Sequence, residues 1–291
     1  MPNSPKSGIS LHGFTSASHT TDLGTYISAL EAFDQIEQLQ ELKQLGIERI
    51  GVAPGSHVLD AGCGFGLETL RLARIALPAG EVTGCDLSPD FLAEARRRAE
   101  DAHLNITFEQ GHVESLPYPD CAFNAVWSER LLIYVPNLQK AVSEIHRVLA
   151  PGGKAAFIEP DLSTTTINLA DRSLVRRVMG HEAETSVVHG YLPGELLSTL
   201  RTTGFTGIAL ATRVLVFPHD LAVSYFTQCG RSAAKDGAIS SSDLEQWIAG
   251  VHDLGASGRL FATVGYFLFT SATPRPPTSA SNLATTAVMR S

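Results

Sequence analysis

A glycine-rich segment between an apolar run and a helix-like run constrains the fold of this chain more than any other feature. The apolar run ends at Asp60, glycines follow at positions 62, 64 and 66, and Leu67–Ala73 has helical spacing. Glycine lacks a Cβ and adopts positive φ readily, so the turn is tight and a ligand can approach the backbone closely. The following helix would point unpaired N–H groups at the turn, which favours an anionic ligand group. The segment predicts a strand, a ligand-binding loop and a helix.

The chain after this segment alternates strand-like and helix-like runs. Four further strands are predicted there: Glu81–Asp86, Ile106–Glu109, Ala122–Ser128 and Lys154–Glu159. Such an alternation is typical of a parallel sheet with helices on both faces. Beyond residue 161 the alternation stops, and two long strands, at 207–217 and 260–270, flank a helical insertion. We therefore expect an α/β fold with an additional helical part.

Charge and hydropathy narrow the classes of partner. The 291 residues carry a net charge of −8, which argues against electrostatic binding of nucleic acid. The basic run at 96–98 lies on a predicted helix and is interpreted as a solvated face. No apolar run reaches the length of a membrane span, and the N-terminus lacks the apolar segment of a secretory signal. We predict a soluble, cytoplasmic protein without a membrane span.

The four cysteines, at positions 63, 85, 121 and 229, are interpreted as reduced thiols. They form no CxxC pair and show no His-Cys spacing of a metal site. A reduced cytosolic setting suits such a set, and we predict no bound metal ion.

Acidic and polar residues gather at the ends of the predicted strands, where parallel α/β sheets bind their ligands. These residues are Asp60, Asp86, His112, Ser128, Glu129 and Glu159. Asp86 lies 20 residues after Gly66, where nucleotide-binding units place an acid that accepts hydrogen bonds from ribose hydroxyls. The alternative is a charge that only stabilises the N-terminus of the next helix. The spacing and the strand-end position favour the ribose role.

Four motifs occur in a fixed order along the chain: Val58–Gly66, Gly84–Ser88, Leu116–Val126 and His146–Gly153. The first resembles motif I of class I S-adenosylmethionine (SAM)-dependent methyltransferases, and the second is similar to the acidic motif that follows it. The third is similar to the LPFPDxxFDxV stretch, and the fourth to the RVLKPGG stretch, of the branch that contains ubiquinone and menaquinone methyltransferases. The resemblance is close over residues 50–160 and weaker up to 217.

This resemblance implies a Rossmann-like fold with helices on both faces of a seven-stranded, mostly parallel sheet. The last strand would be antiparallel and lie between strands five and six. The implied organisation has four parts: a flexible arm at 1–22, N-terminal helices and a SAM-binding core at 23–161, cap segments and the rest of the sheet at 162–272, and a disordered tail at 273–291.

The resemblance also implies which residues hold the methionyl part of SAM. These residues are Asp60, Gly62, Cys63, Gly64 and Ser128. Asp60 would lie near the amino group, whereas the glycine loop and Ser128 would make contacts through their backbone. Tyr26, near the start of the N-terminal helix, could close over the methionyl group, and the alternative is a tyrosine of the core.

For the nucleoside part, the resemblance implies that Asp86 binds the ribose and that Leu87 lies against the adenine. The N–H of Val113 would meet an adenine nitrogen. The family often has Gly-Asp-Ala where this chain has a glycine followed by His112 and Val113, so the usual carboxylate for the adenine amino group is missing. His112 could accept that hydrogen bond through an unprotonated ring nitrogen, or Glu114 could replace the carboxylate.

Methyl transfer from a sulfonium is an in-line displacement, for which positioning and desolvation matter most. A general base is needed only if the acceptor must lose a proton. The candidates are Glu129, His181, Glu182 and His189. The histidines have the alternative of surface or packing residues in a variable cap, and Glu129 could instead pair with Arg130.

We predict a SAM-dependent methyltransferase that acts on N, O or C of a small, partly apolar metabolite of secondary or quinone-like metabolism. The N-terminal helix, the 162–190 segment and the 220–258 insertion would select this acceptor. One alternative is a protein that uses bound SAM without methyl transfer. Another is an NAD-dependent oxidoreductase, although Asp60 before the loop and the final glycine spacing argue against it. The oligomeric state stays open, a homodimer included.

Overall fold

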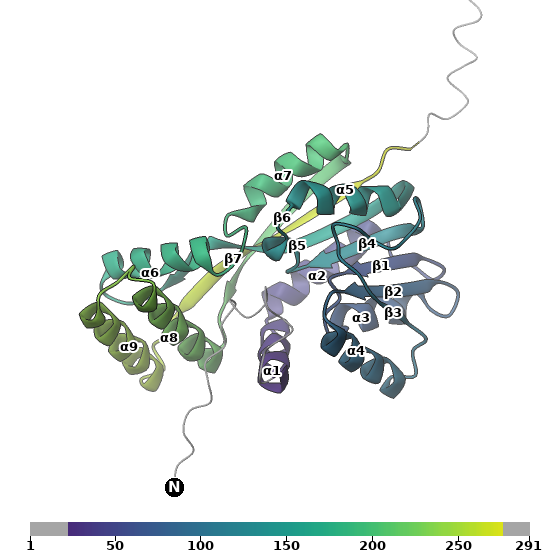
Figure 1. Ribbon diagram of the computed structural model, residues 1–291. Coiled ribbons are helices and arrows are strands. Elements are labelled where there is room, and N and C mark those ends of the chain that lie inside the picture. Colours follow the sequence, from purple (N-terminus) through teal and green to yellow (C-terminus); the bar gives the residue numbers. More distant parts are fainter. Residues whose placement is uncertain (1–22, 276–291) are drawn as a thin grey trace, which may run out of the picture.

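A computed structural model describes residues 23–275 of the chain. The predicted arm at 1–22 and most of the predicted tail, 276–291, lie outside the described residues. Within the described part, helices flank a central sheet, and a separate group of helices packs at one end of it (Figure 1).

Seven strands of the described part form a single sheet. Their bounds are β1 His57–Ala61, β2 Glu81–Asp86, β3 Thr107–Gln110, β4 Phe123–Glu129, β5 Leu149–Ile167, β6 Thr206–Val216 and β7 Ala262–Ala272. Their order across the sheet is β3-β2-β1-β4-β5-β7-β6. The pairs among the first five strands are parallel, whereas β7 runs antiparallel to both β5 and β6. The predicted Rossmann-like α/β fold, with its antiparallel inserted strand, is confirmed.

Helices cover both faces of this sheet. Their bounds are α1 Leu23–Asp34, α2 Glu37–Ile50, α3 Leu67–Ala76, α4 Pro89–Asp101, α5 Leu138–Val148, α6 Arg172–Thr185, α7 Leu192–Thr203, α8 His219–Lys235 and α9 Ser241–Ala256, with a 3-10 turn η2 at Leu132–Tyr134. α2, α3 and α4 lie on one face and α5 and α7 on the other (Figure 1). Between residues 23 and 275, no helix is both long and apolar enough to cross a bilayer.

Two apolar cores fill the space between the sheet and these helix layers. On one face, α5 and α7 contribute Val142 and Leu196, both fully buried. On the other, α2 and α3 pack Leu42 and Leu72 in the cluster that holds Trp127 of β4. Each fully buried side chain of this kind stabilises the fold by about 1.5–3 kcal/mol. The cores fix the strand ends, and therefore the loops that follow them.

β5 departs most from the predicted elements. The sequence predicted a strand at Lys154–Glu159 and a mixed helical segment from 162, whereas β5 continues to Ile167. Its second half is rich in Ser and Thr, yet it pairs with β7 as far as Ile167 opposite Ala262. This tertiary pairing supplies the backbone hydrogen bonds and overrides the local composition. The boundary predicted between residues 161 and 162 therefore falls inside a strand.

α6, α8 and α9 form a cap beside the extended ends of β5 and β7 (Figure 1). The cap has a core of its own, in which Val178, Phe226 and Trp247 are fully buried. The Trp247 indole donates a hydrogen bond to the carbonyl of Phe226 at 2.6 Å. A Cβ on Gly230 would lie 2.3 Å from the Trp247 ring, so only glycine allows α8 and α9 to approach this closely. The helical insertion predicted at 220–258 corresponds to α8 and α9.

Candidate active site

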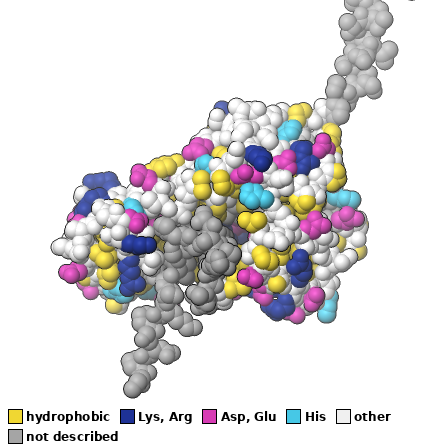
Figure 2. All heavy atoms as spheres, viewed as in Figure 1, with side chains coloured by type: hydrophobic (Ala, Val, Ile, Leu, Met, Phe, Trp, Pro, Cys, Tyr) yellow, Lys and Arg dark blue, Asp and Glu magenta, His cyan; other side chains and the backbone are white. Residues whose placement is uncertain are grey.

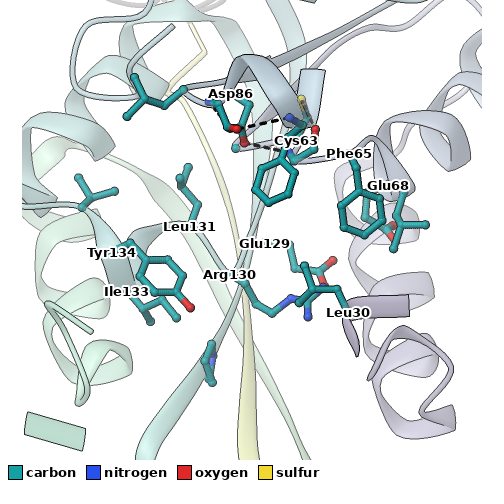
Figure 3. Close-up of a pocket in the computed structure, with 18 of the residues that line it drawn as sticks. Leu30, Cys63, Phe65, Glu68, Asp86, Glu129, Arg130, Leu131, Ile133 and Tyr134 are labelled. Atoms are coloured by element: carbon teal, nitrogen blue, oxygen red, sulfur yellow. Dashed lines mark hydrogen bonds and ion pairs between the residues drawn. The ribbon is translucent and has the colours of Figure 1, made fainter. Parts of the chain in front are cut away.

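A cavity of about 540 Å³ lies at the carboxyl ends of β1, β2 and β4. Its walls come from the glycine loop, the start of α4 and the segment after β4, and on the far side from α1, α8, β5 and β7. Figure 3 shows Asp86 and Cys63 at one end of the view, with Glu129 and Arg130 below them. On the outer surface shown in Figure 2, acidic and basic side chains are interspersed. The cavity occupies the edge of the sheet where the sequence predicted a ligand site.

The glycine loop presents bare backbone to this cavity. Gly62 and Gly64 have φ of +76° and +51°, a region that side-chain-bearing residues rarely adopt. A Cβ on Gly62 would lie 2.8 Å from the Leu131 side chain. A Cβ on Gly64 would meet no atom of the described chain within 4 Å. The space beside Gly64 therefore suits a ligand that packs against the main chain.

Asp86 at the end of β2 braces the loop and faces the cavity. Its Oδ2 accepts a hydrogen bond from the N–H of Gly64 at 2.9 Å, and its Oδ1 accepts from the N–H of Ser88 at 2.8 Å. Burial raises the pKa of Asp86, and these backbone hydrogen bonds oppose the rise. A carboxylate oxygen has more than one lone pair, so Asp86 can still accept from a ligand hydroxyl. Leu87 beside it is 60% exposed and also lines the cavity.

Asp60 at the end of β1 is buried beneath the loop. Its Oδ2 accepts a hydrogen bond from Oγ1 of Thr69 at 2.6 Å. Burial raises the pKa of Asp60 to about 8, and the neighbouring carboxylates of Glu68, Glu129 and Asp86 act in the same direction. A nearby cation favours the anionic form of such a carboxyl group. The surroundings therefore suit the predicted place of Asp60 near an amino group, which stays a prediction.

A buried lysine that the sequence analysis missed lies beside the glycine loop. Lys43 of α2 has no exposed surface and forms ion pairs with Asp34, with Glu68 at 2.8 Å and with Glu129 at 3.0 Å. Burial lowers the pKa of Lys43, but the three carboxylates outweigh that effect and raise it above its ordinary value. Arg130 adds a second cation, 3.3 Å from the other oxygen of Glu129. We call the five residues of this group the floor cluster: Asp34, Lys43, Glu68, Glu129 and Arg130.

Glu129, a predicted catalytic candidate, does reach the cavity wall. Both of its carboxylate oxygens face cations of the floor cluster, Lys43 on one side and Arg130 on the other. The predicted alternative of a pair with Arg130 therefore holds in the structure. Glu129 contributes to the charge balance of the floor cluster, and its action as a base stays a prediction.

The two histidine candidates lie away from the cavity. His181 Nε2 is 3.0 Å from Oδ2 of Asp236, which ties α6 to the segment after α8. His189 Nδ1 is 2.8 Å from Oε2 of Glu195, and its Nε2 is 3.0 Å from the carbonyl oxygen of Val135. Neither histidine belongs to the described wall of the cavity. The described structure therefore does not bring His181 or His189 to the cavity wall, which agrees with the packing alternative, and their catalytic role stays a prediction.

At the predicted adenine end, His112 and Val113 line the cavity. His112 Nδ1 accepts the N–H of Glu114 at 3.1 Å, so in the neutral ring Nε2 carries the proton and can only donate a hydrogen bond to a ligand. Glu114 instead accepts the N–H of Asn137 at 2.8 Å, before α5, and is not part of the described wall. Neither alternative for the missing carboxylate therefore has a free acceptor aimed at the cavity in this arrangement, and His112 lines the wall as a hydrogen-bond donor.

Of the remaining predicted residues, only Cys63 belongs to the described wall of the cavity. Cys63 lines the cavity, and burial raises the pKa of its thiol well above the ordinary value, so it is protonated and a poor nucleophile. Ser128 is fully buried, and the described wall contains the next residue, Glu129, in its place. Tyr26 belongs to α1, whose Phe33 lines the cavity, but the Tyr26 side chain lies outside the described part of the structure. Among the described residues, no cluster of His, Cys, Asp or Glu is suited to a metal ion.

Residues 58–153, which include the glycine loop, Asp86 and the segment after β4, match a sequence family described as "Methyltransferase domain". This part of the chain is a class I SAM-dependent methyltransferase domain. The chain is 30% identical over 156 residues to a demethylmenaquinone methyltransferase of Chlorobaculum parvum, covering 52% of this chain and 62% of that protein. It therefore spans less than two thirds of that relative.

Two further similarities extend beyond the methyltransferase domain. An uncharacterised 37.1 kDa protein in transposon Tn4556 of Streptomyces fradiae is 28% identical over 252 residues, or 85% of this chain and 72% of that protein. The crystal structure of the 4+2 cyclase SpnF is 26% identical with a TM-score of 0.53, and the match covers 82% of each chain. Both similarities reach past the methyltransferase domain into the part that contains the cap.

Proposed function

We propose that the protein transfers the methyl group of SAM to N, O or C of a small, partly apolar metabolite. The observation that carries this proposal is the continuity of the cavity. It joins the glycine loop and Asp86 of the methyltransferase domain to an apolar chamber formed by α1, α8, β5 and β7. A cofactor at the loop and an acceptor in the chamber would therefore share one continuous cavity.

The residues at the loop fit SAM. The bare backbone at Gly64 gives room for close packing, and Asp86 keeps acceptor capacity for ribose hydroxyls. Burial and the neighbouring carboxylates raise the pKa of Asp60 to about 8, so a positively charged ligand beside Asp60 would favour its anionic form. When bound, SAM supplies an activated methyl group on a cationic sulfonium.

The chain contributes mainly position and exclusion of water. Leu30 of α1 lies across the cavity from Ile133 and Tyr134 (Figure 3), and Tyr225 of α8 lines the chamber on the cap side. In-line displacement gains most from holding the two reacting atoms in contact and in line, away from bulk water. A polar side chain that takes part in bond making is not required for an acceptor that is already nucleophilic.

The test of the proposal is methyl transfer from SAM labelled in its methyl group. Purified protein would be incubated with a panel of neutral phenols, quinols and amines, because a relative is a demethylmenaquinone methyltransferase. We expect label in at least one acceptor, and roughly 10- to 100-fold less label with the Asp86→Ala variant when SAM is limiting. Binding of SAM without transfer to any acceptor would argue against a methyltransferase.

A second candidate is a protein that binds SAM and catalyses a reaction other than methyl transfer. The similarity to SpnF, a 4+2 cyclase, over 82% of this chain favours keeping this candidate. The two candidates differ in the fate of the cofactor. A product that forms while the amount of SAM stays constant would support the second candidate.

A further inference from the structure

The chamber under the cap contains a hydroxyl group placed to hold the methyl acceptor. We propose that Oγ1 of Thr165 forms a hydrogen bond with an oxygen atom of a neutral, ring-containing acceptor and so sets its position. This inference rests on the proposed function, because it assigns the acceptor half of the same cavity. Thr165 would act as a positioning residue.

Thr165 combines burial with an unmatched hydrogen-bonding group. Its side chain lines the cavity and the residue is only 5% exposed. Its Oγ1 has no hydrogen-bond partner within the described part of the chain. Most buried polar groups are paired, because an unpaired one forfeits its hydrogen bonds to water. A buried hydroxyl that faces a ligand cavity is therefore explained by a ligand that supplies the partner.

The backbone around Thr165 is shaped to aim this hydroxyl. The register between β5 and β7 shifts after Asp161, where a bulge interrupts the pairing. The Asp161 carboxylate accepts the N–H of Ser163 at 3.0 Å. Thr164 Oγ1 donates to the carbonyl of Asp161 and accepts the N–H of Gly265, both at 2.7 Å. Bulges beside active sites redirect side chains, and here Thr164 is tied to the strands while Thr165 turns to the cavity.

The chamber near Thr165 favours a neutral ligand. The charged residues of the described wall belong to the ends of β1 and β2 and to the floor cluster. By contrast, β5, α8 and β7 contribute apolar and aromatic residues together with Thr165. The Tyr225 hydroxyl donates a hydrogen bond to Oε1 of Glu182 at 3.1 Å. Glu182 itself does not belong to the described wall, so it adds no charge to the chamber surface. A charged group of the acceptor would lose hydration against these apolar and aromatic walls.

Aromatic rings give the chamber walls that suit a flat ring. Phe217 and Tyr225 are stacked, with centroids 5.3 Å apart and planes at 17°. Phe33 lies 5.8 Å from Phe217 and 5.7 Å from Tyr266. Aromatic faces and edges favour contact with another ring. Because a hydroxyl both donates and accepts, Thr165 can bind either a carbonyl or a hydroxyl substituent of that ring.

The test compares ring probes that differ only in their substituent. 2-Naphthol, naphthalene and 2-naphthoate would be measured by equilibrium dialysis against protein saturated with S-adenosylhomocysteine. We expect wild type to bind 2-naphthol about three- to tenfold more tightly than naphthalene, the effect of one neutral hydrogen bond. The anionic 2-naphthoate should bind more weakly than both. Thr165→Val should reduce the ratio of 2-naphthol to naphthalene affinity to about one, whereas Thr165→Ser should preserve it.

Thr227→Val is the matched control. Thr227 of α8 is 7% exposed, and its Oγ1 also lacks a hydrogen-bond partner in the described chain, but it does not line the cavity. Removing either unpaired hydroxyl should leave the protein folded and raise its Tm by a few degrees. Only Thr165→Val should change the probe ratio, which separates acceptor binding from stability.

Four results would overturn the proposal. They are a ratio near one in wild type, an unchanged ratio in Thr165→Val, an equal change in Thr227→Val, and no binding of either neutral probe. Failure of the protein to bind S-adenosylhomocysteine by calorimetry would instead overturn the proposed function. The probe ratio would then be measured on the protein alone, so the two failures remain distinguishable.

Discussion

At the scale of single residues, the carboxylate of Asp86 connects loop geometry with ligand binding. It accepts hydrogen bonds from the N–H groups of Gly64 and Ser88, and Asp86 also lines the cavity. We expect Asp86→Ala to weaken SAM binding by roughly 10- to 100-fold, because both a ligand hydrogen bond and the loop brace are lost. Isothermal titration calorimetry with SAM measures the effect. Asp90→Ala, an exposed acid in the first turn of α4, is the control and should leave the affinity unchanged.

Glu159 is a buried carboxyl group with a pH-dependent effect on stability. Its Oε1 accepts the N–H groups of Leu131 and Leu132 at 3.1 and 2.9 Å. Burial raises its pKa from 4.5 to about 8, and these hydrogen bonds oppose the rise. The folded state therefore binds this proton more tightly than the unfolded state. Its contribution to stability is greatest below pH 4.5 and declines towards pH 8, by about 1.4 kcal/mol per pH unit.

We expect Glu159→Gln to flatten the decline in unfolding free energy between pH 5 and pH 8, because the amide cannot ionise. Urea unfolding at a series of pH values measures the slope in wild type and variant. Glu245→Gln, on the exposed side of α9, is the control and should keep the wild-type slope. An equal slope in wild type and Glu159→Gln would show that Glu159 does not hold the proton.

The residues of the glycine loop could be predicted from sequence because their spacing encodes their geometry. Lys43 and Thr165 could not. Lys43 occupies a position in the apolar stripe of α2 beside Leu39 and Leu42, and this unusual placement was the available signal. The direction of Thr165 depends on a bulge that forms only when β5 meets β7. His181 was predicted near the site because the sequence alone does not show which way a cap residue points.

At the scale of elements, the floor cluster joins α1, α2, α3 and β4. We expect Lys43→Met to lower the free energy of unfolding by about 3–5 kcal/mol, because it leaves buried carboxylates without their shared cation. Denaturant unfolding measures the loss. Lys140→Met on the exposed side of α5 is the control and should change stability by less than about 0.5 kcal/mol. A loss below about 1 kcal/mol in Lys43→Met would contradict the pairing.

The contact between β5 and β7 depends on Gly265. A Cβ at this position would lie 2.8 Å from Oγ1 of Thr164, inside the bulge. We expect Gly265→Ala to destabilise the protein by about 1–3 kcal/mol through overpacking. Gly180→Ala is the matched control, since a Cβ there meets nothing within 4 Å in the described chain. Within α6, alanine should instead stabilise by about 0.5–1 kcal/mol, and thermal unfolding of both variants distinguishes the two effects.

Elements from β1 to α5 could be predicted nearly to the residue. Their apolar periodicity and their capping residues are local, as with Ser88 at the N-cap of α4 and Pro89 at its first position. The second half of β5 could not be predicted, because its strand conformation comes from pairing with residues about one hundred positions later. Local composition there indicated a polar loop.

At the scale of the whole molecule, β5 and β7 run from the core of the sheet into the cap (Figure 1). The cavity therefore has one half in the methyltransferase domain and the other against the cap, on strands that both parts share. The fold class could be predicted because the motifs fix the order of the first five strands. The chamber walls from α1 and α8 belong to segments that the sequence predicted to select the acceptor, whereas the walls from β5 and β7 could not be predicted, because they depend on pairing between residues far apart in the sequence.

The central claim is that the cavity at the glycine loop binds SAM. Parallel calorimetric titrations of the wild-type protein with SAM and with NAD test it most directly. We expect saturable binding of SAM at one site per chain and no binding of NAD. Binding of NAD, or no heat of binding with SAM, would contradict the assignment of the cavity.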